Sequence, residues 1–380
     1  MHDVIVIGGG PAGASAAVTA ARAGLRTALV DKARFPRDKL CGGGFTGRSL
    51  SSFQQIFDAP RPDAPMLCRT EMAFYAFGQH LGTFQDCPPL YLAMRRSLDA
   101  ELCARAIAAG AEDFTGRAMQ SLTPDGAVTL VDGTSLKAPV VIGADGVNSP
   151  TARSLFGTAF NRRDIGFALE VECQTSPCTL PIRIDFGAAD WGYGWAFPKP
   201  HGVTVGVGGL LRRNPDLKAL LDGYLATTGI ESHSSVKGQF LPFGHARKQP
   251  GKGRVLLAGD AAGLVDPITG EGIAYAMKSG QMAALASIQA LANGTPETAL
   301  TQYRQDLRTI TKAIGQARFL RQLMFRPIFR RVFINSFARS THLRHEYLRL
   351  LAGETEYSGL SRSISRRLPR YFWRTIANTR

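Results

Sequence analysis

Three glycines near the start of the chain have the spacing of a turn that brings a phosphate against the backbone. In Gly8-x-Gly10-x-x-Gly13, the first glycine permits a sharp turn and the second lets a pyrophosphate approach the main chain. The third lets a helix lie close to a strand. Pro11 suits the first helical turn, where its missing N–H leaves no bond unmade. The remaining free N–H groups of that helix start would hold a dinucleotide pyrophosphate.

The residues around this turn support the same interpretation. Residues 3–7 form an apolar strand, an alanine-rich helix follows the glycines, and Asp31 ends the next strand 18 residues after Gly13. An acid near this spacing meets a ribose hydroxyl of a bound dinucleotide. The sequence therefore predicts a dinucleotide site built from a strand, a glycine turn, a helix and a second strand.

Three later loops also have residues that suit contact with a ligand. Residues 41–44 read Cys-Gly-Gly-Gly, and such a loop allows close approach of the backbone to a flat molecule. Asp145 and Gly146 follow one apolar strand, and Gly259 and Asp260 follow another. Ligands of open α/β sheets lie outside the carboxyl ends of the strands, so we expect these loops to surround the dinucleotide.

An aromatic segment lies within a β-like stretch from residue 162 to residue 244. Trp191, Tyr193, Trp195 and Phe197 occupy alternate positions, and strand geometry would place all four rings on one face. An ordinary sheet core is the alternative interpretation. The cofactor site nearby is the reason to expect a wall of a substrate channel.

The remaining patterns predict a combined α/β and α+β protein. Residues 95–110 have helical spacing and end on glycine, residues 111–136 suggest strands, and the sequence after Ala274 is helical nearly to its end. We expect a dinucleotide-binding domain interleaved with an antiparallel-sheet substrate domain and followed by a basic helical region. The expected ranges are 1–60, 91–160 and 250–295 for the first, 61–90 and 161–249 for the second, and 296–380 for the third.

The net charge of +15 is concentrated in the last fifth of the chain. Residues 301–380 hold 17 Lys and Arg against 4 Asp and Glu. Such a region suits an anionic membrane surface, a phosphorylated substrate, an acidic protein or nucleic acid, unless it is simply a solvated helical face. No nucleic-acid module is recognisable, so nucleic acid is not an expected partner. A basic amphipathic helix on anionic lipid fits better.

Cysteine usage indicates a reducing compartment. The six cysteines form no C-x-x-C pair and no metal-ligand spacing, so we expect no metal site. No secretory signal pattern is found, and no apolar run reaches about 18 residues. These observations predict a cytoplasmic protein that associates at most peripherally with the inner face of the membrane.

Three motifs together resemble the FAD-binding set of the flavoproteins related to para-hydroxybenzoate hydroxylase. In chain order they are Gly8-x-Gly10-x-x-Gly13, Asp145-Gly146 and Gly259-Asp260. Within that superfamily, the segments 35–44, 193–199 and 260–272 are similar to those of the geranylgeranyl reductase family. The resemblance implies a Rossmann-like FAD-binding domain. It also implies that Asp31 and Arg95 contact the adenosine and pyrophosphate side of FAD.

For the flavin end of the cofactor, the resemblance implies that Asp260 reaches the ribityl and pyrophosphate region. It places Pro267, Gly270, Gly272 and Ile273 against the isoalloxazine. The full set of expected FAD contacts is Gly8, Gly10, Pro11, Ala12, Gly13, Asp31, Lys32, Cys41, Gly42, Gly43, Arg95, Ala118, Asp145, Gly146, Gly259, Asp260, Pro267, Gly270, Gly272 and Ile273.

The resemblance implies that the protein saturates carbon–carbon double bonds of an isoprenoid chain. Such a reduction needs a hydride from reduced flavin at one carbon and a proton at the other, with an apolar channel that aligns the chain. Cys41, Tyr193 and Trp195 are the expected catalytic residues, and Trp191, Tyr193, Trp195 and Phe197 are expected to bind substrate. The alternative for Cys41 is a small packed hydrophobe. A tyrosine pKa of about 10 permits proton donation without indicating it.

Two other functions stay open at this point. One is an FAD-dependent monooxygenase acting on an aromatic or lipidic substrate, and the other is an electron-transfer flavoprotein that docks through its basic C-terminal region. Because the glycine fingerprint is assigned to FAD, no dedicated NADPH site is visible, and either NADPH or reduced ferredoxin, an acidic protein, would suit as electron donor. The segment 193–198 is also near the flavin-dependent halogenase motif. Halogenases need an active-site lysine, however, and this chain has none between Lys39 and Lys137.

Overall fold

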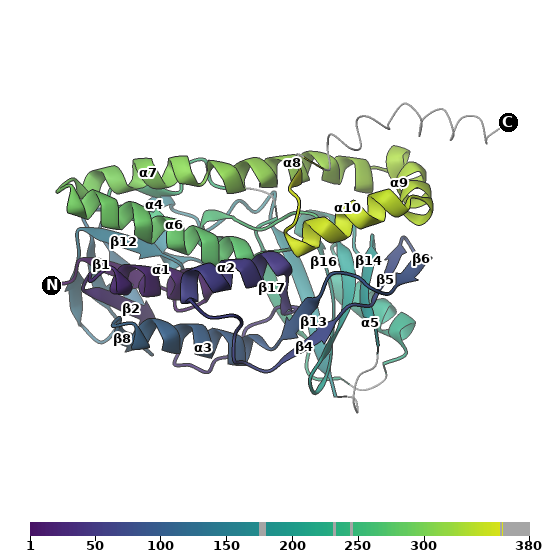
Figure 1. Ribbon diagram of the computed structural model, residues 1–380, viewed down its shortest axis with the longest axis horizontal. Helices are drawn as coiled ribbons and strands as arrows, with labels where there is room; N and C mark the ends of the chain where they lie inside the picture. The colour runs from purple at the N-terminus through teal and green to yellow at the C-terminus, as the bar shows by residue number, and fades with distance from the viewer. Residues whose placement is uncertain (175–179, 231–232, 244–245, 358, 360–380) are drawn as a thin grey trace.

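The computed structural model describes residues 1–174, 180–230, 233–243, 246–357 and 359. Two large sheets lie toward opposite ends of an elongated molecule, and a layer of helices runs along one side of both (Figure 1). This architecture confirms the predicted combination of α/β and α+β parts.

The first sheet has six strands in the order β18-β19-β12-β1-β2-β8, and it is parallel except for the short edge pair β18–β19. Its central strands are continuous apolar runs because both of their faces are buried. The strands are β1 (Val4–Ile7), β2 (Thr27–Asp31), β8 (Glu112–Thr115), β12 (Val140–Gly143), β18 (Gly251–Lys252) and β19 (Val255–Leu257).

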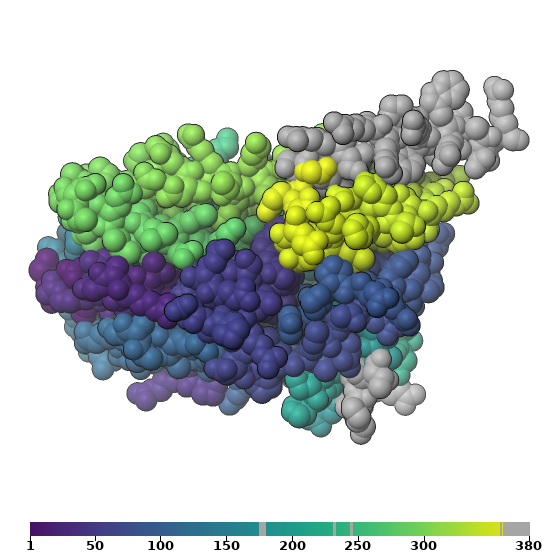
Figure 2. All heavy atoms as spheres, viewed as in Figure 1, coloured from purple at the N-terminus to yellow at the C-terminus, as the bar shows by residue number. Residues whose placement is uncertain are grey.

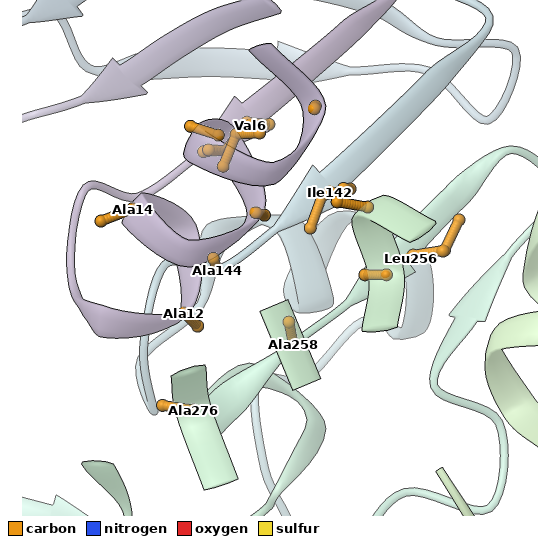
Figure 3. Packing of buried hydrophobic residues seen from close by; sticks show 14 of the residues in the cluster. Val6, Ala12, Ala14, Ile142, Ala144, Leu256, Ala258 and Ala276 are labelled. Atoms are coloured by element: carbon orange, nitrogen blue, oxygen red, sulfur yellow. The ribbon is translucent and has the colours of Figure 1, made fainter. Parts of the chain in front are cut away.

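Three helices cover this sheet: α1 (Pro11–Arg22), α3 (Arg95–Ala108) and α6 (Ile273–Ala292). Small residues let α1 and α6 approach closely, and a Cβ added at Gly280 would lie 1.9 Å from the carbonyl oxygen of Ala12. Figure 3 shows the resulting core, in which alanines of the helices meet branched side chains of the strands. The labelled residues are Val6, Ala12, Ala14, Ile142, Ala144, Leu256, Ala258 and Ala276.

The second sheet has seven strands in the order β17-β13-β16-β15-β14-β5-β6. It is antiparallel, as expected for the second domain, except where β5 lies parallel to β14. The exception arises because the β5–β6 hairpin, from an earlier part of the chain, joins the edge of the sheet. The strands are β5 (Met72–Ala76), β6 (Gln79–Phe84), β13 (Gly166–Cys173), β14 (Ile182–Phe186), β15 (Tyr193–Lys199), β16 (Gly202–Leu210) and β17 (Lys237–Leu241).

Two small sheets and three further helices accompany the two large sheets. A three-stranded sheet contains β3 (Gly44–Phe45), β7 (Leu90–Ala93) and β4 (Met66–Arg69), and another contains β9 (Met119–Leu122), β10 (Ala127–Leu130) and β11 (Ser135–Lys137). Three further helices are α2 (Gly47–Phe57), α4 (Pro150–Phe156) and α5 (Leu217–Thr228). The helix α5 lies within residues 162–244, a stretch that the sequence pattern predicted to form strands. It packs on β13 and β16 through Leu217, Leu221 and Tyr224.

The described part of the C-terminal region is helical, as the sequence predicts, in α7 (Ala299–Asp306), α8 (Arg308–Phe325), α9 (Pro327–Arg339) and α10 (Thr341–Ala352). Residue 358 and residues 360–380 of the predicted helical region lie outside the described residues. Phe337 of α9 and Tyr347 of α10 pack edge-on against Phe74 and Phe186 of the seven-stranded sheet. In Figure 2 the yellow helix α10 lies directly beside the dark blue surface of α2. Among the described residues, none of the helices has the length and apolar character that a membrane span requires.

Candidate active site

One cavity of about 520 Å³ lies at the carboxyl ends of β1, β2 and β12 and extends to the face of the seven-stranded sheet. Residues from every predicted motif border it. The predicted residues that line the cavity are Gly8, Gly10, Pro11, Ala12, Asp31, Lys32, Cys41, Gly42, Gly43, Arg95, Ala118, Asp145, Gly146, Tyr193, Trp195, Phe197, Asp260, Gly270, Gly272 and Ile273.

The glycine turn has the geometry that the spacing predicts. Gly8 has a φ of +106°, and a Cβ there would lie 2.3 Å from the carbonyl oxygen of Ala144. A Cβ at Gly13 would lie 1.6 Å from the carbonyl oxygen of Gly8, so only glycine lets α1 pack against this turn. Gly10 has no such neighbour in the protein, since the nearest atom to its added Cβ is an Arg37 nitrogen at 3.4 Å. Its missing side chain therefore leaves room for a ligand.

Two predicted carboxylates have different surroundings at the edge of the cavity. Asp31 is buried at the end of β2, where its Oδ2 accepts a bond from the Gly9 N–H at 2.7 Å and its Oδ1 one from the Ala33 N–H at 2.8 Å. Asp145 accepts a bond from the Thr151 N–H at 2.8 Å and a short bond from the Ser149 hydroxyl, so it stabilises the start of α4. Burial raises the pKa of Asp145.

Basic residues gather where the pyrophosphate would lie. Arg95 is buried and makes a bidentate ion pair with the fully buried Asp99, at 2.6 and 2.8 Å. Arg37 pairs with the same carboxylate at 3.1 Å and also lines the cavity beside Lys39. The sequence interpretation missed Arg37, Lys39 and Asp99. The i,i+4 spacing of Arg95 and Asp99 on a predicted helix was a signal for their pairing.

Two charged side chains of the seven-stranded sheet, Glu170 and Lys199, bond to the backbone of the loop that carries Cys41. Glu170 of β13 accepts a bond from the Cys41 N–H at 2.9 Å, and Lys199 of β15 donates a short bond to the Gly42 carbonyl. Lys199 also donates to the Ala93 carbonyl at 3.2 Å. Both side chains are buried, and burial raises the pKa of Glu170 to about 7 and lowers that of Lys199 to about 8. Neither residue was among those predicted.

Three of the four predicted aromatic residues face the cavity together. Tyr193 and Trp195 lie with their rings 5.7 Å apart, and Phe197 continues the same face of β15. The Tyr193 hydroxyl donates to the Thr269 carbonyl at 3.3 Å. The prediction that Trp191 shares this face is wrong, because Trp191 precedes the strand in a turn with a φ of +54° and stacks on Phe325 of α8.

Three other predicted residues are buried but do not line the cavity: Gly13, Gly259 and Pro267. Gly13 and Gly259 act through packing, and Gly259 has a φ of +59° beside Ala12 and Ala276. The Gly259 N–H donates to the hydroxyl of Ser279 at 2.9 Å, which joins the loop to α6.

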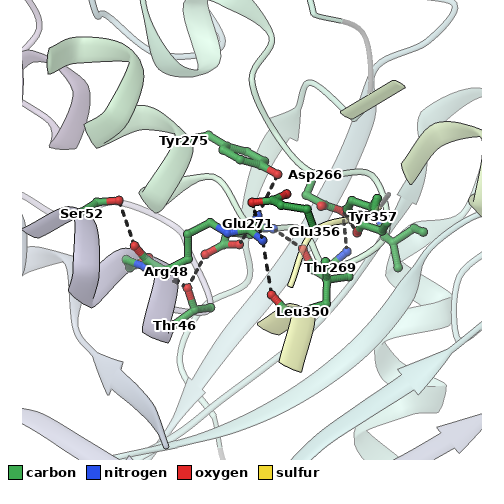
Figure 4. Close-up of polar contacts among 12 residues, drawn as sticks. Thr46, Arg48, Ser52, Asp266, Thr269, Glu271, Tyr275, Leu350, Glu356 and Tyr357 are labelled. Atoms are coloured by element: carbon green, nitrogen blue, oxygen red, sulfur yellow. Dashed lines mark hydrogen bonds and ion pairs between the residues drawn. The ribbon is translucent and has the colours of Figure 1, made fainter. Parts of the chain in front are cut away.

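The loop of residues 266–272 is fixed to the C-terminal part of the chain by polar contacts (Figure 4). The fully buried Tyr357 donates from its hydroxyl to Asp266 at 2.8 Å, and Asp266 also accepts from the Ile268 and Thr269 N–H groups. Arg48 of α2 donates to the Thr355 carbonyl at 3.4 Å. Residues outside the predicted set therefore position this loop.

FAD fits the chemistry of this cavity. The glycine turn offers free N–H groups at the start of α1, and the basic residues beside it complement a pyrophosphate. At the other end, the buried Trp195 Nε1–H has no hydrogen-bond partner among the described residues, so it can donate to a ligand in the cavity. The fold and this site define an FAD-dependent oxidoreductase.

Comparison with known proteins agrees with this class. Residues 3–70 match the family model of FAD-dependent oxidoreductases. Over 320 residues the chain is 33% identical to the geranylgeranyl diphosphate reductase of Rhodobacter capsulatus, which covers 78% of this chain and 77% of that protein. It is also 33% identical over 309 residues to the menaquinone reductase of Mycobacterium tuberculosis, covering 74% of this chain and 75% of that protein.

The chain belongs to the geranylgeranyl reductase family of FAD-dependent oxidoreductases. Solved structures agree in fold. A geranylgeranyl bacteriochlorophyll reductase-like protein of Thermoplasma acidophilum has a TM-score of 0.79 at 21% identity and covers 96% of this chain and 98% of its own. A flavin-dependent brominase has a TM-score of 0.72 at 17% identity, with coverages of 97% and 99%. The predicted fold and family are confirmed.

Proposed function

We propose that this protein reduces carbon–carbon double bonds in the isoprenoid chain of a lipid, with a hydride from reduced FAD. The observation that carries the proposal is that the FAD cradle and the aromatic face of β15 border one continuous cavity. Its further walls are apolar and come from several elements. These side chains are Leu90, Ile184, Phe240, Leu241, Val265 and Leu351.

An apolar cavity suits this substrate because an isolated alkene offers no charge for recognition. The chain must be held by shape and by burial of its methyl and methylene groups, each worth about 0.8 kcal/mol when buried. Tyr193, Trp195 and Phe197 supply large apolar surfaces along the cavity. When bound, FAD supplies the hydride. The part of the protein is then to align the alkene and exclude water.

The relatives support the substrate class without identifying the substrate. One is named for geranylgeranyl diphosphate and another for menaquinone, so their names give no single head group. Accordingly, we propose an isoprenoid chain as the recognised part, whichever head group it bears.

The test is mass analysis of geranylgeranyl diphosphate and of menaquinone after incubation with the FAD-loaded, chemically reduced protein without oxygen. We expect at least one substrate to gain hydrogen pairs. Unchanged masses, together with oxygen incorporation under air with NADPH, would instead indicate a monooxygenase. Unchanged masses in both conditions would leave an electron-transfer flavoprotein as the better hypothesis.

The electron donor is proposed to be NADPH or reduced ferredoxin. The two are distinguished by anaerobic stopped-flow measurement of flavin bleaching at 450 nm with each donor. An acidic donor protein would suit the basic C-terminal helices, and bleaching by ferredoxin should then slow as salt increases.

We also propose that α8 and α9 contact an anionic membrane surface, where an isoprenoid lipid would be found. Phe319 and Ile328 are 68% and 79% exposed, and the exposed Arg318, Arg326 and Arg331 lie close to them in the sequence. Apolar side chains flanked by basic ones are typical of an interfacial helix. Co-sedimentation with phosphatidylglycerol vesicles at low salt should be lost in the double variant Phe319→Ser and Ile328→Ser.

A further inference from the structure

A buried carboxyl group borders the cavity within the loop that the family resemblance assigns to the isoalloxazine. Glu271 lies between Gly270 and Gly272, both of which line the cavity, and its side chain is only 4% exposed. The hydroxyl of Thr46 donates a short hydrogen bond to Glu271 Oε1. Thr46 lines the cavity too, and it is the N-cap of α2, where it accepts the Ser49 N–H at 3.1 Å.

One cation pairs with this carboxyl, and two acidic groups oppose its effect on the carboxyl. Arg48 Nη1 lies 3.5 Å from Glu271 Oε2 and also donates to the Tyr275 hydroxyl at 2.9 Å (Figure 4). Asp266 of the same loop and Glu356 of the C-terminal segment act on Glu271 in the opposite direction. Burial outweighs the effect of Arg48 and raises the pKa of Glu271 to about 7. The group therefore exchanges its proton near neutral pH.

Two other acids near the cavity, Tyr193 and Glu170, are less suited to giving a proton to carbon. Burial raises the pKa of Tyr193 well above its usual value of 10, and its hydroxyl already donates to the Thr269 carbonyl. Glu170 is buried beneath the Cys41 loop and does not line the cavity. A general acid works best when its pKa lies near the operating pH, which favours Glu271.

We propose that Glu271 is the general acid that protonates the alkene, with Thr46 and Arg48 as its positioning residues. This inference rests on the proposed reductase function. One alkene carbon gains a hydride from reduced FAD, which is thereby oxidised, and the Glu271 O–H bond breaks as a C–H bond forms at the other carbon. The carboxylate that remains is stabilised by Arg48 and Thr46, and it regains a proton from solvent.

The test compares Glu271→Gln with the wild-type protein in single-turnover reduction of the prenyl substrate by FAD-loaded, chemically reduced enzyme. Loss of the acid should slow alkene reduction by at least about 100-fold. Glu271→Asp, which keeps the acid, should retain far more activity than Glu271→Gln. Glu297→Gln, at an exposed position of the short helix before α7, is the matched control and should behave as wild type.

A second readout does not depend on turnover. The visible spectrum of bound, oxidised FAD should shift with an apparent pKa near 7 in the wild type, and Glu271→Gln should abolish that transition while binding one FAD per chain. A Glu271→Gln variant with the wild-type rate would overturn the inference and leave the proposed function intact. If Glu271→Gln fails to bind FAD, Glu271→Asp decides, and a folded Asp variant without activity would also overturn the inference. A wild-type protein that reduces no prenyl chain would refute the proposed function first.

Discussion

Two alanine substitutions in the glycine turn should have different effects. Gly13→Ala should destabilise the fold, and Gly10→Ala should weaken FAD binding. In Gly13→Ala the new Cβ meets the Gly8 carbonyl oxygen at 1.6 Å and Val6 at 3.3 Å. A backbone oxygen cannot rotate away, so we expect a loss of about 3 kcal/mol or more in the free energy of unfolding. In Gly10→Ala the Cβ meets the flexible end of Arg37 at 3.4 Å and Asp99 Oδ2 at 4.0 Å, both ordinary contacts, and the backbone conformation is extended.

The Gly10→Ala protein should therefore fold with a stability within about 1 kcal/mol of the wild type. Its methyl group would instead hold the pyrophosphate away from the start of α1. Loss of one charge-assisted hydrogen bond, worth about 2 kcal/mol, corresponds to roughly 30-fold weaker FAD binding.

The assay has two parts, applied to Gly10→Ala, Gly13→Ala and a control variant. Urea unfolding of the apoprotein gives the stability, and quenching of FAD fluorescence on titration gives the dissociation constant. Gly223→Ala is the control, because nothing lies within 4 Å of its added Cβ in α5. It should change neither FAD affinity nor, by more than about 1 kcal/mol, the stability.

Two results would refute this reasoning. Wild-type FAD affinity in Gly10→Ala would show that the pyrophosphate does not approach the backbone at that position. Wild-type stability in Gly13→Ala would show that α1 does not depend on the close contact with Gly8.

Three further predictions concern buried polar groups. The folded wild type holds the Glu170 proton up to a pKa of about 7, against 4.5 ordinarily, so it loses stability as pH rises between these values. Glu170→Gln lacks this titration, and its free energy of unfolding relative to wild type should therefore rise by up to about 3 kcal/mol between pH 5 and 8. Parallel pH profiles of the two proteins in urea unfolding would contradict this. Asp99→Asn leaves Arg95 and Arg37 without their shared carboxylate and should lower the free energy of unfolding of the apoprotein by about 3–5 kcal/mol in urea. The loss should be smaller with FAD bound, because the pyrophosphate would pair with the two arginines. Equal losses with and without FAD would argue against a pyrophosphate at this position. Trp195→Phe should weaken binding of FAD or substrate about tenfold by titration, and unaltered affinity for both would show that the Trp195 Nε1–H serves no ligand.

The parts of the site that depend on local geometry could be predicted from the sequence. The turn at Gly8 and the close packing at Gly13 follow from residues within one strand, turn and helix. Strand alternation correctly placed Tyr193, Trp195 and Phe197 on one face. It failed for Trp191 because alternation holds only within a strand, and the backbone turns at that residue with a φ of +54°.

Contacts between distant segments could not be predicted in this way. Glu170 follows Cys41 by 129 residues and Lys199 follows Gly42 by 157, so no local pattern connects either pair. Each of these charged residues lies within a mostly apolar strand. Burying a charged group without a partner costs free energy. A charged residue in an apolar strand is therefore the signal in the sequence that Glu170 and Lys199 each bond to another part of the chain.

The same reasoning changes the meaning of the C-terminal region. Its charge suggested a surface that only meets a partner, yet Arg48 bonds to carbonyls that follow it by 302 and 307 residues. The Tyr357 hydroxyl bonds to Asp266 in the loop of residues 266–272, and Leu351 forms part of the cavity wall. If α8 and α9 meet a membrane as we propose, the surface that contacts lipid and the wall that contacts substrate belong to one continuous run of helices. Binding to lipid would then present the isoprenoid chain on the same helical region that lines the cavity in which we propose that it is reduced.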